Sequence, residues 1–585
     1  MASVTFSRRD FIGTAAAWGA WSALPALAVP ETKPVLRFGF MTDTHVGKTV
    51  ASCARVRQAL ELFREKGVEL VINGGDIADW HYPTGYAAYR QVFDEVFAGG
   101  AKPREIYAYA WHDSYAWKGR PRSETAVHAP EAFEDVRKLL KAPNAHTDII
   151  RIKGCTFLVF PQFTGQKGFL SWQEYESRVA QACGENPGKP VFVVDHVPPR
   201  GTVYDSYNWG NPRTREILGR YPQVVDLSGH VHGSLRNDLL IWQGEFTVVN
   251  AGCLQVWNGL LAANDAPGKQ SYGVLTVDVH ADRLVVRRWD VRDRSEICAD
   301  RPWVVPLPFA AAGAPYSPDR LRAAEPVPAF APDDRLSVVA EGDPFVGFRL
   351  TFPECSARAM LYRLAAQHRR PDGTWGTFTW CETFSDYWMH PKDRTGCVKF
   401  LFRAGFFRSS VSYRFVVTPV SPHGVAGRPL VAEAASPATF AKETVVFESR
   451  DPATEFGYCR DDAKQTPHRP DAEGFYGPAN CGRNYLKLPA GAFAGPAGTK
   501  FRLALDIRTI QPETGSTWSV RFQDPKKPFG ASGRISTPGG DSGDERYLLE
   551  LTKSERNDGD TYYVCFEWGA TGRVRFDGVS LVRMD

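Results

Sequence analysis

The stretch that decides the fold reads Leu227-Ser228-Gly229-His230-Val231-His232-Gly233. His230 and His232 are two residues apart, and on a strand end or an extended turn this spacing lets both imidazoles reach a common centre. The flanking glycines, Gly229 and Gly233, allow tight backbone geometry there. A single His-x-His pair is weak evidence, so its meaning depends on matching side chains elsewhere in the chain.

Upstream of this stretch, apolar runs repeatedly end in side chains that can bind a metal. The runs predicted to be strands are 35–41, 69–72, 105–110, 155–160, 190–194 and 224–227. The polar residues that follow them are Asp43 and His45, Asp76 and Asp79, His112 and Asp113, His196, and finally His230 and His232. Residues 50–66 between the first two runs show helical spacing, with Val56, Leu60 and Phe63 on one face.

Alternating strands and helices predict a largely parallel sheet with helices on its faces. In such sheets the ligand site lies beyond the carboxyl ends of the strands. The sequence therefore predicts that these side chains converge, although they are far apart in the chain. Carboxylates and imidazoles together suit zinc, manganese or iron. Two such ions about 3.5–4 Å apart need a bridging anion, which a carboxylate can supply, and a shared water would ionise near neutral pH.

The order D-x-H, G-D-x-x-D, H-D, H-x-P-P, G-H-x-H resembles the calcineurin-like metallophosphoesterase family over residues 35–290, about half the chain. The resemblance implies an α/β fold, a β-sandwich flanked by helices, at residues 33–300. It also implies a metal-dependent phosphoric ester hydrolase, acting on a phosphomonoester or phosphodiester through a metal-activated hydroxide. The cofactor would be one or two divalent ions, Mn, Zn or Fe.

The same resemblance implies a role for each matching residue. Asp43, His45 and His232 would bind the first metal, Asp76 would bridge, and His196 and His230 would bind the second metal. His112 would protonate or stabilise the leaving group, with Asp113 orienting its ring. Asp79 would support the loop.

One position departs from the family. The third motif normally reads Gly-Asn-His-Asp/Glu, and its Asn binds the second metal, but this chain has Ala110-Trp111-His112-Asp113. An indole offers only an N–H donor and cannot ligate a metal. Water, substrate or another residue would replace the amide, or the second site is weak or empty. Asn144 is the nearest later Asn, but its context fits the loop before residues 149–152. Trp111 therefore leaves open a second interpretation, a glycan- or surface-binding protein with a degenerate, inactive phosphoesterase domain.

Aromatic residues are frequent in the loops of this first domain. They are Trp80, Tyr82, Trp111, Tyr115, Trp117, Tyr204, Tyr207 and Trp209. They would either pack long loops or form a rim that holds a sugar, a base or a lipid group beside the phosphate. Arg200 and Lys118 would contact phosphate oxygens or remain solvated. A rival enzyme hypothesis has a phosphorylated or nucleotide-linked sugar as substrate, delivered to glycan by the C-terminal domain.

The N-terminus resembles a twin-arginine export signal. Ser7 to Ile12 contains Arg8-Arg9, an apolar run follows, and Ala26-Leu27-Ala28 offers a cleavage site. We expect residues 1–28 to be removed and the mature protein to be periplasmic or extracellular. No later stretch is apolar enough to span a bilayer and no Cys lies near the cleavage point, so we expect no stable membrane anchor. The net charge of +4 with no basic run gives no support for a nucleic-acid polymer as partner.

The rest of the chain predicts two β-rich domains. Residues 301–335 are rich in Pro and Ala and predict a linker or a strap along the surface. Residues 336–436 resemble a fibronectin type III-like β-sandwich, with Tyr413 as its corner tyrosine. Residues 437–585 resemble a jelly-roll domain whose closing strand is 574–582, a kind of module that often binds carbohydrate. Trp518, Tyr547 and Trp568 would be core residues there or a sugar platform. The expected partners are thus a small-molecule or glycan-linked phosphoester and, through this last domain, carbohydrate.

Overall fold

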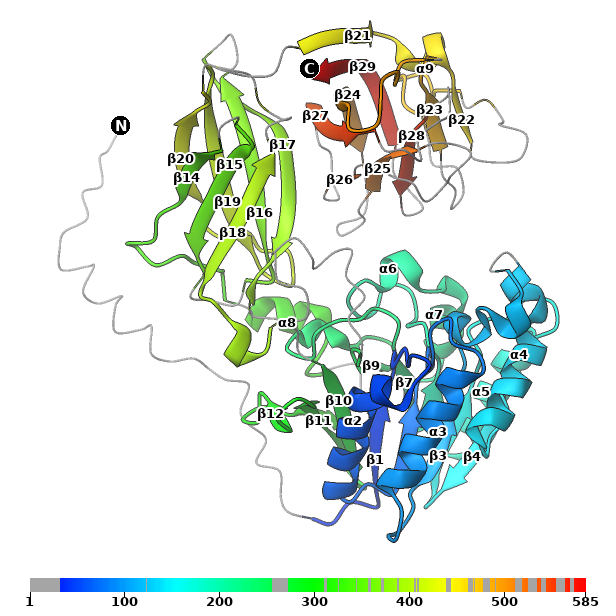
Figure 1. Cartoon of the computed structure of the whole chain (residues 1–585). Helices are drawn as coiled ribbons and strands as arrows, with labels where there is room; N and C mark the ends of the chain where they lie inside the picture. The colour runs from blue at the N-terminus through cyan, green and yellow to red at the C-terminus, as the bar shows by residue number, and fades with distance from the viewer. Residues whose placement is uncertain are drawn as a thin grey trace, which may run out of the picture.

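The computed structural model describes residues 32–584 with gaps. The longer gaps are 255–271, 438–442, 461–466, 477–483, 511–517, 524–533, 538–542 and 554–562. Residues 1–28, the predicted export signal, lie outside the described residues. In the described part, no helix is long and apolar enough to cross a membrane. Figure 1 shows the N-terminal domain at the bottom and the two β-rich domains above it.

The first sheet of the N-terminal domain has seven strands in the order β12-β11-β10-β1-β2-β3, and β13 also pairs with β11. Strands β1, β2 and β3 run parallel to one another, whereas β10 to β13 join antiparallel. Their bounds are β1 Leu36–Met41, β2 Leu70–Asn73, β3 Arg104–Tyr107, β10 Gly273–Val279, β11 Arg283–Asp290, β12 Ser295–Ile297 and β13 Trp303–Pro306.

The second sheet has the order β4-β5-β6-β7-β9-β8. Its central strands β5, β6, β7 and β9 are parallel, and the edge strands β4 and β8 are antiparallel to their neighbours. The bounds are β4 Asp148–Ile152, β5 Cys155–Val159, β6 Val191–Val194, β7 Val224–Ser228, β8 Ile241–Gln243 and β9 Thr247–Asn250. Since parallel central strands are covered on both faces, their residues are almost uniformly buried.

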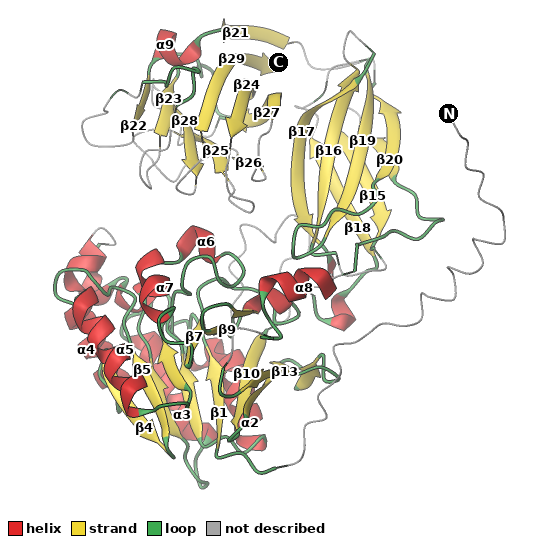
Figure 2. Ribbon diagram, turned by 180° about the vertical axis from the view of Figure 1, so that it is seen from behind, coloured by secondary structure: helices red, strands yellow, loops and turns green. Residues whose placement is uncertain are grey.

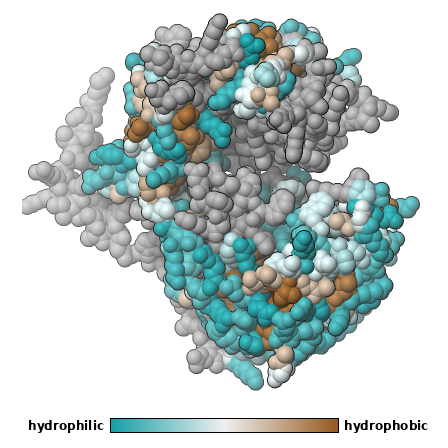
Figure 3. All heavy atoms as spheres, viewed as in Figure 1, coloured by the Kyte–Doolittle hydropathy of each residue, from teal (hydrophilic) through white to brown (hydrophobic). Residues whose placement is uncertain are grey.

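The two sheets pack face to face and helices cover both outer faces, as Figure 2 shows. Apolar side chains such as Phe38, Ile72 and Phe192 fill the space between the sheets. Helices α2 Ala54–Glu65, α3 Thr84–Val96 and α4 Thr125–Leu140 cover the first sheet, and α5 Trp172–Glu185 and α7 Pro212–Leu218 cover the second. The predicted β-sandwich flanked by helices is therefore confirmed. On the face shown in Figure 3, hydrophilic residues cover most of this domain.

The segment predicted as a linker is partly built into the first domain. Strand β13 lies within residues 301–335 but pairs with β11 of the first sheet. Trp303 is 2% exposed and packs between the sheets, with the Arg288 guanidinium 4.4 Å from its ring. Burial of this indole outweighs the Pro-rich composition that suggested an independent strap. Helix α8 Pro318–Ala324 follows before the next domain.

The remaining chain forms all-β domains, as predicted. One has a three-stranded sheet β14-β15-β18 and a four-stranded sheet β17-β16-β19-β20. The bounds are β14 Ser337–Glu341, β15 Gly347–Pro353, β16 Leu361–Arg369, β17 Trp375–Phe384, β18 Cys397–Arg403, β19 Ser412–Val420 and β20 Leu430–Ala435. Tyr413 is buried at the start of β19. The fibronectin type III assignment stays a prediction.

The last domain also has two sheets, β21-β29-β24-β27 and β22-β23-β28-β25-β26. The bounds are β21 Glu443–Ser449, β22 Tyr458–Arg460, β23 Asn484–Lys487, β24 Lys500–Ile510, β25 Trp518–Gln523, β26 Arg534–Thr537, β27 Gly543–Thr552, β28 Tyr563–Trp568 and β29 Arg573–Met584. Trp380 of β17 packs in its core. The side chains of Trp518, Tyr547 and Trp568 lie outside the described part, so the jelly-roll and carbohydrate assignments stay predictions.

Candidate metal centre

All six predicted metal ligands come together at one edge of the two sheets. They lie in loops that follow the carboxyl ends of β1, β2, β6 and β7, and His112 follows β3. Their ligand atoms form three groups, each with all atoms within 4.8 Å of one another: Asp43, His45 and His232; His45, Asp76 and His112; Asp76, His196 and His230. Because Asp76 and His45 each belong to two groups, the three groups make one continuous centre.

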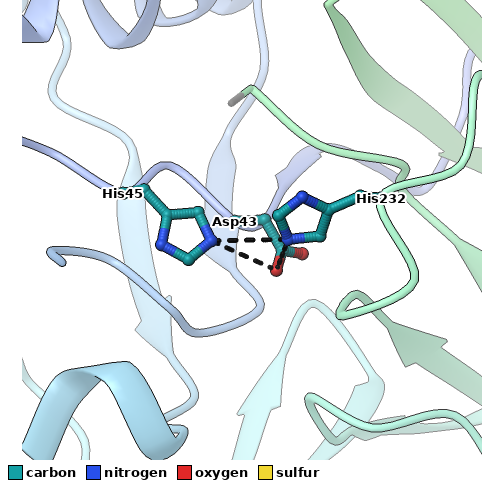
Figure 4. Close-up of side chains that lie close together, drawn as sticks. All are labelled: Asp43, His45 and His232. Atoms are coloured by element: carbon teal, nitrogen blue, oxygen red, sulfur yellow. Dashed lines mark hydrogen bonds and ion pairs between the residues drawn. The ribbon is translucent and has the colours of Figure 1, made fainter. Parts of the chain in front are cut away.

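The first group is drawn in Figure 4. The His232 Nε2 lies 2.9 Å from Asp43 Oδ1 and 3.4 Å from His45 Nε2, and Asp43 Oδ1 lies 3.8 Å from His45 Nε2. The other carboxylate oxygen of Asp43 accepts hydrogen bonds from the His230 backbone N–H and the Thr42 hydroxyl, at 2.8 and 2.9 Å. One oxygen of Asp43 thus faces the imidazoles while the other fixes the carboxylate in place.

The group of Asp76, His196 and His230 lies on the other side of the centre and is also largely buried. The His196 Nε2 lies 3.1 Å from Asp76 Oδ2 and 3.2 Å from His230 Nδ1. The other ring nitrogen of His196 donates to the Gly74 carbonyl at 2.9 Å, which leaves Nε2 to face the centre. Asp76 Oδ1 accepts from the His112 backbone N–H at 3.1 Å. A backbone bond to the far nitrogen is the arrangement that orients an imidazole toward a metal.

Close approach of the backbone explains the glycine before His230. A Cβ at Gly229 would lie 2.1 Å from Thr42 Oγ1 and 2.6 Å from Asp43 Oδ2, so only glycine fits beside the first ligand. The left-handed backbone belongs instead to the ligands: Asp43, His45, Asp76, His230 and His232 have φ between 38° and 70°. Asp and His are among the residue types that adopt this conformation most readily.

The carboxylates and imidazoles of the centre strongly affect one another's pKa values. Burial would raise the pKa of Asp43, but His232 and His196 hold it well below its usual range. Burial would lower the pKa of His196, but Asp76 and Asp43 raise it to about 10. The charge of Asp43 likewise raises the pKa of His232 well above its usual range. In contrast, burial and the charge of His196 lower the pKa of His230 to about 3. These shifts favour the protonated forms of His196 and His232 beside the two carboxylates.

The donor set fits divalent metal ions. Two pairs of ring nitrogens face each other, at 3.4 Å in His45–His232 and at 3.2 Å in His196–His230. Two imidazole lone pairs repel at such distances unless a proton or a cation lies between them. Mixed imidazole and carboxylate donors match zinc, manganese or iron. Metal ions would displace the protons, so metal affinity should rise with pH.

The role predicted for Asp113 is wrong, and Asp79 takes it. The His112 Nδ1 lies 2.6 Å from Asp79 Oδ1, so Asp79 orients the His112 ring. Burial would lower the pKa of His112, but the hydrogen bond to Asp79 and the charges of Asp76 and Asp79 raise it. A raised pKa favours the protonated form of His112, which is the form that a proton donor needs.

Asp113 instead fixes the loop that carries Asp76. Its two carboxylate oxygens accept from the backbone N–H groups of Asp76, Ile77 and Ala110 at 2.9–3.0 Å, and from the Tyr86 hydroxyl at 3.2 Å. Burial and the neighbouring Asp76 charge raise the pKa of Asp113 to about 6. Asp79 and Asp113 both belong to the motifs, and no spacing rule says which of the two reaches the His112 ring.

The structure places Trp111 beside the centre as an exposed side chain. Its ring is 40% exposed and lies 6.1 Å from the Phe163 ring, and its backbone N–H donates to Gln162 Oε1 at 2.9 Å. Asn144 does not replace the missing amide. Its side chain bridges the backbone N–H and C=O of Tyr107 in β3. The group of Asp76, His196 and His230 therefore gains no ligand from either Trp111 or Asn144.

Sequence reasoning missed two residues that support the centre. The Cys253 thiol hydrogen-bonds the His232 ring, and Asn250 donates to the Gly229 carbonyl at 2.6 Å. Asn250 is the last residue of strand β9, and Cys253 follows it three residues later. The rule that polar residues after a strand end reach the site, applied to the apolar run at 246–249, would have found them.

Residues 36–234 match the model of the calcineurin-like phosphoesterase family. The match covers about a third of the chain and contains all six predicted metal ligands, so this region is similar to calcineurin-like phosphoesterase domains. No curated protein sequence matches the chain.

Three solved structures show weak similarity. A CBM4 structure has 12% identity, covers 24% of this chain and 86% of that chain, and gives a TM-score of 0.16. The tandem CBM22-1-CBM22-2 domain of Paenibacillus barcinonensis Xyn10C has 8% identity, 43% and 92% coverage and a TM-score of 0.18. The CBM22-1-GH10 modules of Clostridium thermocellum Xyn10B, complexed with xylohexaose, have 12% identity, 24% and 28% coverage and a TM-score of 0.17. TM-scores this low assign neither a fold nor a ligand to this chain.

Proposed function

We propose that this protein is a metal-dependent phosphoesterase that hydrolyses a phosphomonoester or a phosphodiester. The observation that carries the proposal is the convergence of two carboxylates and four imidazoles from separate loops into one centre. These residues lie within the region that matches the calcineurin-like phosphoesterase family, whose members are generally metal-dependent hydrolases.

The residues of the centre divide into two sets of ligands. Asp43, His45 and His232 would hold one divalent ion, and Asp76, His196 and His230 would hold a second. Asp76 lies in groups with both His45 and His196, which suits a bridging role. Bound divalent ions would lower the pKa of a water and neutralise charge on the phosphoryl oxygens.

Residues outside the ligand sets supply the proton. In hydrolysis the oxygen of a water forms a bond to phosphorus, the P–O bond of the ester breaks, and the departing alkoxide takes a proton. His112 is the donor of that proton, since Asp79 holds its ring and raises its pKa. Asp113 keeps Asp76 and His112 in register through the backbone bonds of their loops.

A pair of measurements tests the proposal. The purified protein would be analysed for metal content and assayed with one aryl phosphomonoester and one aryl phosphodiester, with added Mn²⁺ or Zn²⁺. We expect bound metal and turnover in the wild type, and a loss of turnover of about a hundredfold or more in Asp76→Asn. The exposed Glu131→Gln in α4 serves as the matched control and should behave as wild type. A protein that holds no metal and shows no turnover with any ion would contradict the proposal.

The alternative is a glycan- or surface-binding protein whose phosphoesterase domain is inactive. Trp111 favours it, because an indole stands where the family has a metal-binding amide. The two functions differ in metal content. An inactive domain would bind glycan on an array with the full chain while holding no metal, and the phosphoesterase would hold metal whether or not it binds glycan.

We further propose that the protein is exported by the twin-arginine route and acts in the periplasm or outside the cell. Support comes from Arg8-Arg9 and the Ala26-Leu27-Ala28 site. Replacement of both arginines by lysine should retain the protein in the cytoplasm with its N-terminus uncleaved. Fractionation and N-terminal sequencing would measure this, and unchanged export would refute it.

A further inference from the structure

Four aromatic side chains lie exposed in the loops of the first domain, and three of them border the metal centre. In the described part of the chain, the exposed aromatic residues are Trp80, Trp111, Tyr207 and Trp209, with exposed fractions of 43, 40, 42 and 56%. The other large hydrophobic side chains exposed there are all valines. A large ring in water gives up the burial that normally stabilises it, so exposed aromatic residues clustered at one place mark a binding surface.

The first part of this surface borders the proton donor. Trp80 follows Asp79 directly, and its ring lies 4.9 Å from the Tyr115 ring, which in turn lies 4.6 Å from His112. Trp80 has a φ of 57°, a left-handed backbone that is uncommon for a bulky residue. Trp111 precedes His112 and packs on Phe163. The leaving group of an ester, if it is protonated by His112, would therefore lie beside these aromatic rings.

The second part borders a metal ligand. Trp209, the last residue of α6 Ser206–Trp209, places its ring edge-on against His230, with 5.1 Å between centroids. Its indole N–H donates to Asp205 at 3.2 Å, which sets the direction of the ring. His112 and His230 lie in groups that share Asp76, so both aromatic surfaces border one centre. We name Trp80, Trp111 and Trp209 the indole rim.

The chemistry of the indole rim favours one class of organic group. A sugar ring has apolar C–H faces that stack on an indole and hydroxyl edges that remain in water, which suits half-exposed rings. A lipid chain would need a continuous apolar surface, whereas the rim is interrupted by His112 and His230. A nucleoside polyphosphate would need further cations, and Lys118 in these loops is already paired with Asp135 at 2.9 Å.

We infer that the indole rim is a subsite for the sugar of a phosphorylated carbohydrate whose phosphate lies at the metal centre. The inference rests on the proposed phosphoesterase function and adds the class of substrate. Hydrolysis would release inorganic phosphate, and the sugar oxygen would receive its proton from His112.

Three primary phosphate esters test the inference on the metal-loaded full chain: glucose 6-phosphate, glycerol 1-phosphate and adenosine 5′-monophosphate. They share a primary phosphate ester and differ in the attached group, which is a sugar ring, an acyclic polyol or a nucleoside. We expect kcat/KM for glucose 6-phosphate to exceed that for glycerol 1-phosphate by about tenfold or more. Trp80→Ala and Trp209→Ala should each reduce this ratio several-fold. Val127→Ala, which removes an exposed side chain of the same domain outside the rim, should not change it.

The outcomes separate the two hypotheses. Equal kcat/KM for the sugar and glycerol esters, a ratio unchanged in the rim variants, or a tenfold preference for the adenosine ester would overturn the inference while leaving the phosphoesterase in place. Absence of turnover with every ester would count against the phosphoesterase. In that case, tryptophan fluorescence would be measured while glucose 6-phosphate is added to the same samples. A fluorescence change that is absent in Trp209→Ala supports sugar binding at the indole rim. No fluorescence change in the wild type overturns the inference.

Discussion

At the scale of single residues, the contact between Asp79 and His112 should set the pH range of the proposed hydrolysis. A proton donor works below its pKa and fails above it, and Asp79 raises the pKa of His112. Asp79→Asn keeps a side chain of the same size but removes the charge. We expect the alkaline limit of kcat to move to lower pH and kcat at pH 8 to fall about tenfold to a hundredfold. A pH–rate profile with an aryl phosphomonoester measures both effects.

Asp113→Asn distinguishes the two carboxylates. Asp113 holds the backbone of Asp76 and Ile77, so its loss should lower metal content and stability. Asp79→Asn should leave metal content near that of the wild type. If the alkaline limit does not move in Asp79→Asn, the role assigned to Asp79 is wrong.

A buried carboxylate on strand β7 makes a separate prediction about stability. Asp226 is fully buried, and burial together with the charge of the neighbouring Asp195 raises its pKa well above the usual range. The unfolded chain loses this proton near pH 4 and the folded chain keeps it, so stability falls as pH rises above 4. Asp226→Asn has no carboxyl proton, so its stability does not fall with pH for this reason. Denaturant unfolding should therefore show Asp226→Asn gaining stability over wild type as pH rises above about 4, and a constant difference would contradict the prediction.

At the scale of elements, the turn after β7 fits against the end of β1 only because Gly229 has no side chain. In Gly229→Ala the new methyl group would displace Thr42 and Asp43, which are fixed by their own hydrogen bonds. We expect a loss of about 1–3 kcal/mol in the free energy of unfolding and a clear loss of bound metal. Chemical denaturation and metal analysis measure the two effects.

Gly184→Ala is the matched control for that substitution. Gly184 lies within helix α5, and a Cβ there meets no other atom within 4 Å. The same chemical change should raise stability by up to about 1 kcal/mol, because alanine favours a helix over glycine. If the two substitutions change the free energy of unfolding equally, close packing around Gly229 does not determine the conformation of the turn.

The sequence predicted the elements well wherever an apolar run was short, β-branched and followed by a polar residue. The strands at 36–41, 70–73, 191–194 and 224–228 lie within two residues of their predicted positions, because burial on both faces demands such runs. Which carboxylate reaches His112 was beyond prediction, since Asp79 and Asp113 are both near it and only the loop path decides. Strand β13 was also missed, because burial of Trp303 is a tertiary effect.

At the scale of the whole molecule, the first two domains meet through charged side chains. Asp293, after β11, accepts a hydrogen bond from His390 Nε2 of the second domain at 2.8 Å, and Arg292 forms an ion pair with Asp393. Hydrogen bonds from Ser295 and His390 outweigh burial and lower the pKa of Asp293 to about 2. Replacing Arg292 and Asp293 together with alanine should weaken the contact by about 2 kcal/mol. Calorimetry should then show the unfolding transitions of the two domains further apart.

Lys399→Ala offers the control for the domain contact. Lys399 is an exposed residue of β18, and its loss should leave the transitions as in wild type. Small-angle X-ray scattering adds a second measurement, since a weakened contact should increase the radius of gyration. If neither quantity changes in the double variant, the packing of the domains does not depend on these charges.

The left-handed backbone at five of the six predicted ligands limits how the centre can be redesigned. Asp, Asn and His adopt this conformation readily, whereas Glu and Cys would add a backbone penalty of roughly 1–2 kcal/mol at each position. Efforts to retune metal preference by exchanging donors should therefore succeed with aspartate, asparagine and histidine and fail with thiolates. His196, whose backbone is not left-handed, is the one ligand of the six at which a sulfur donor escapes that penalty.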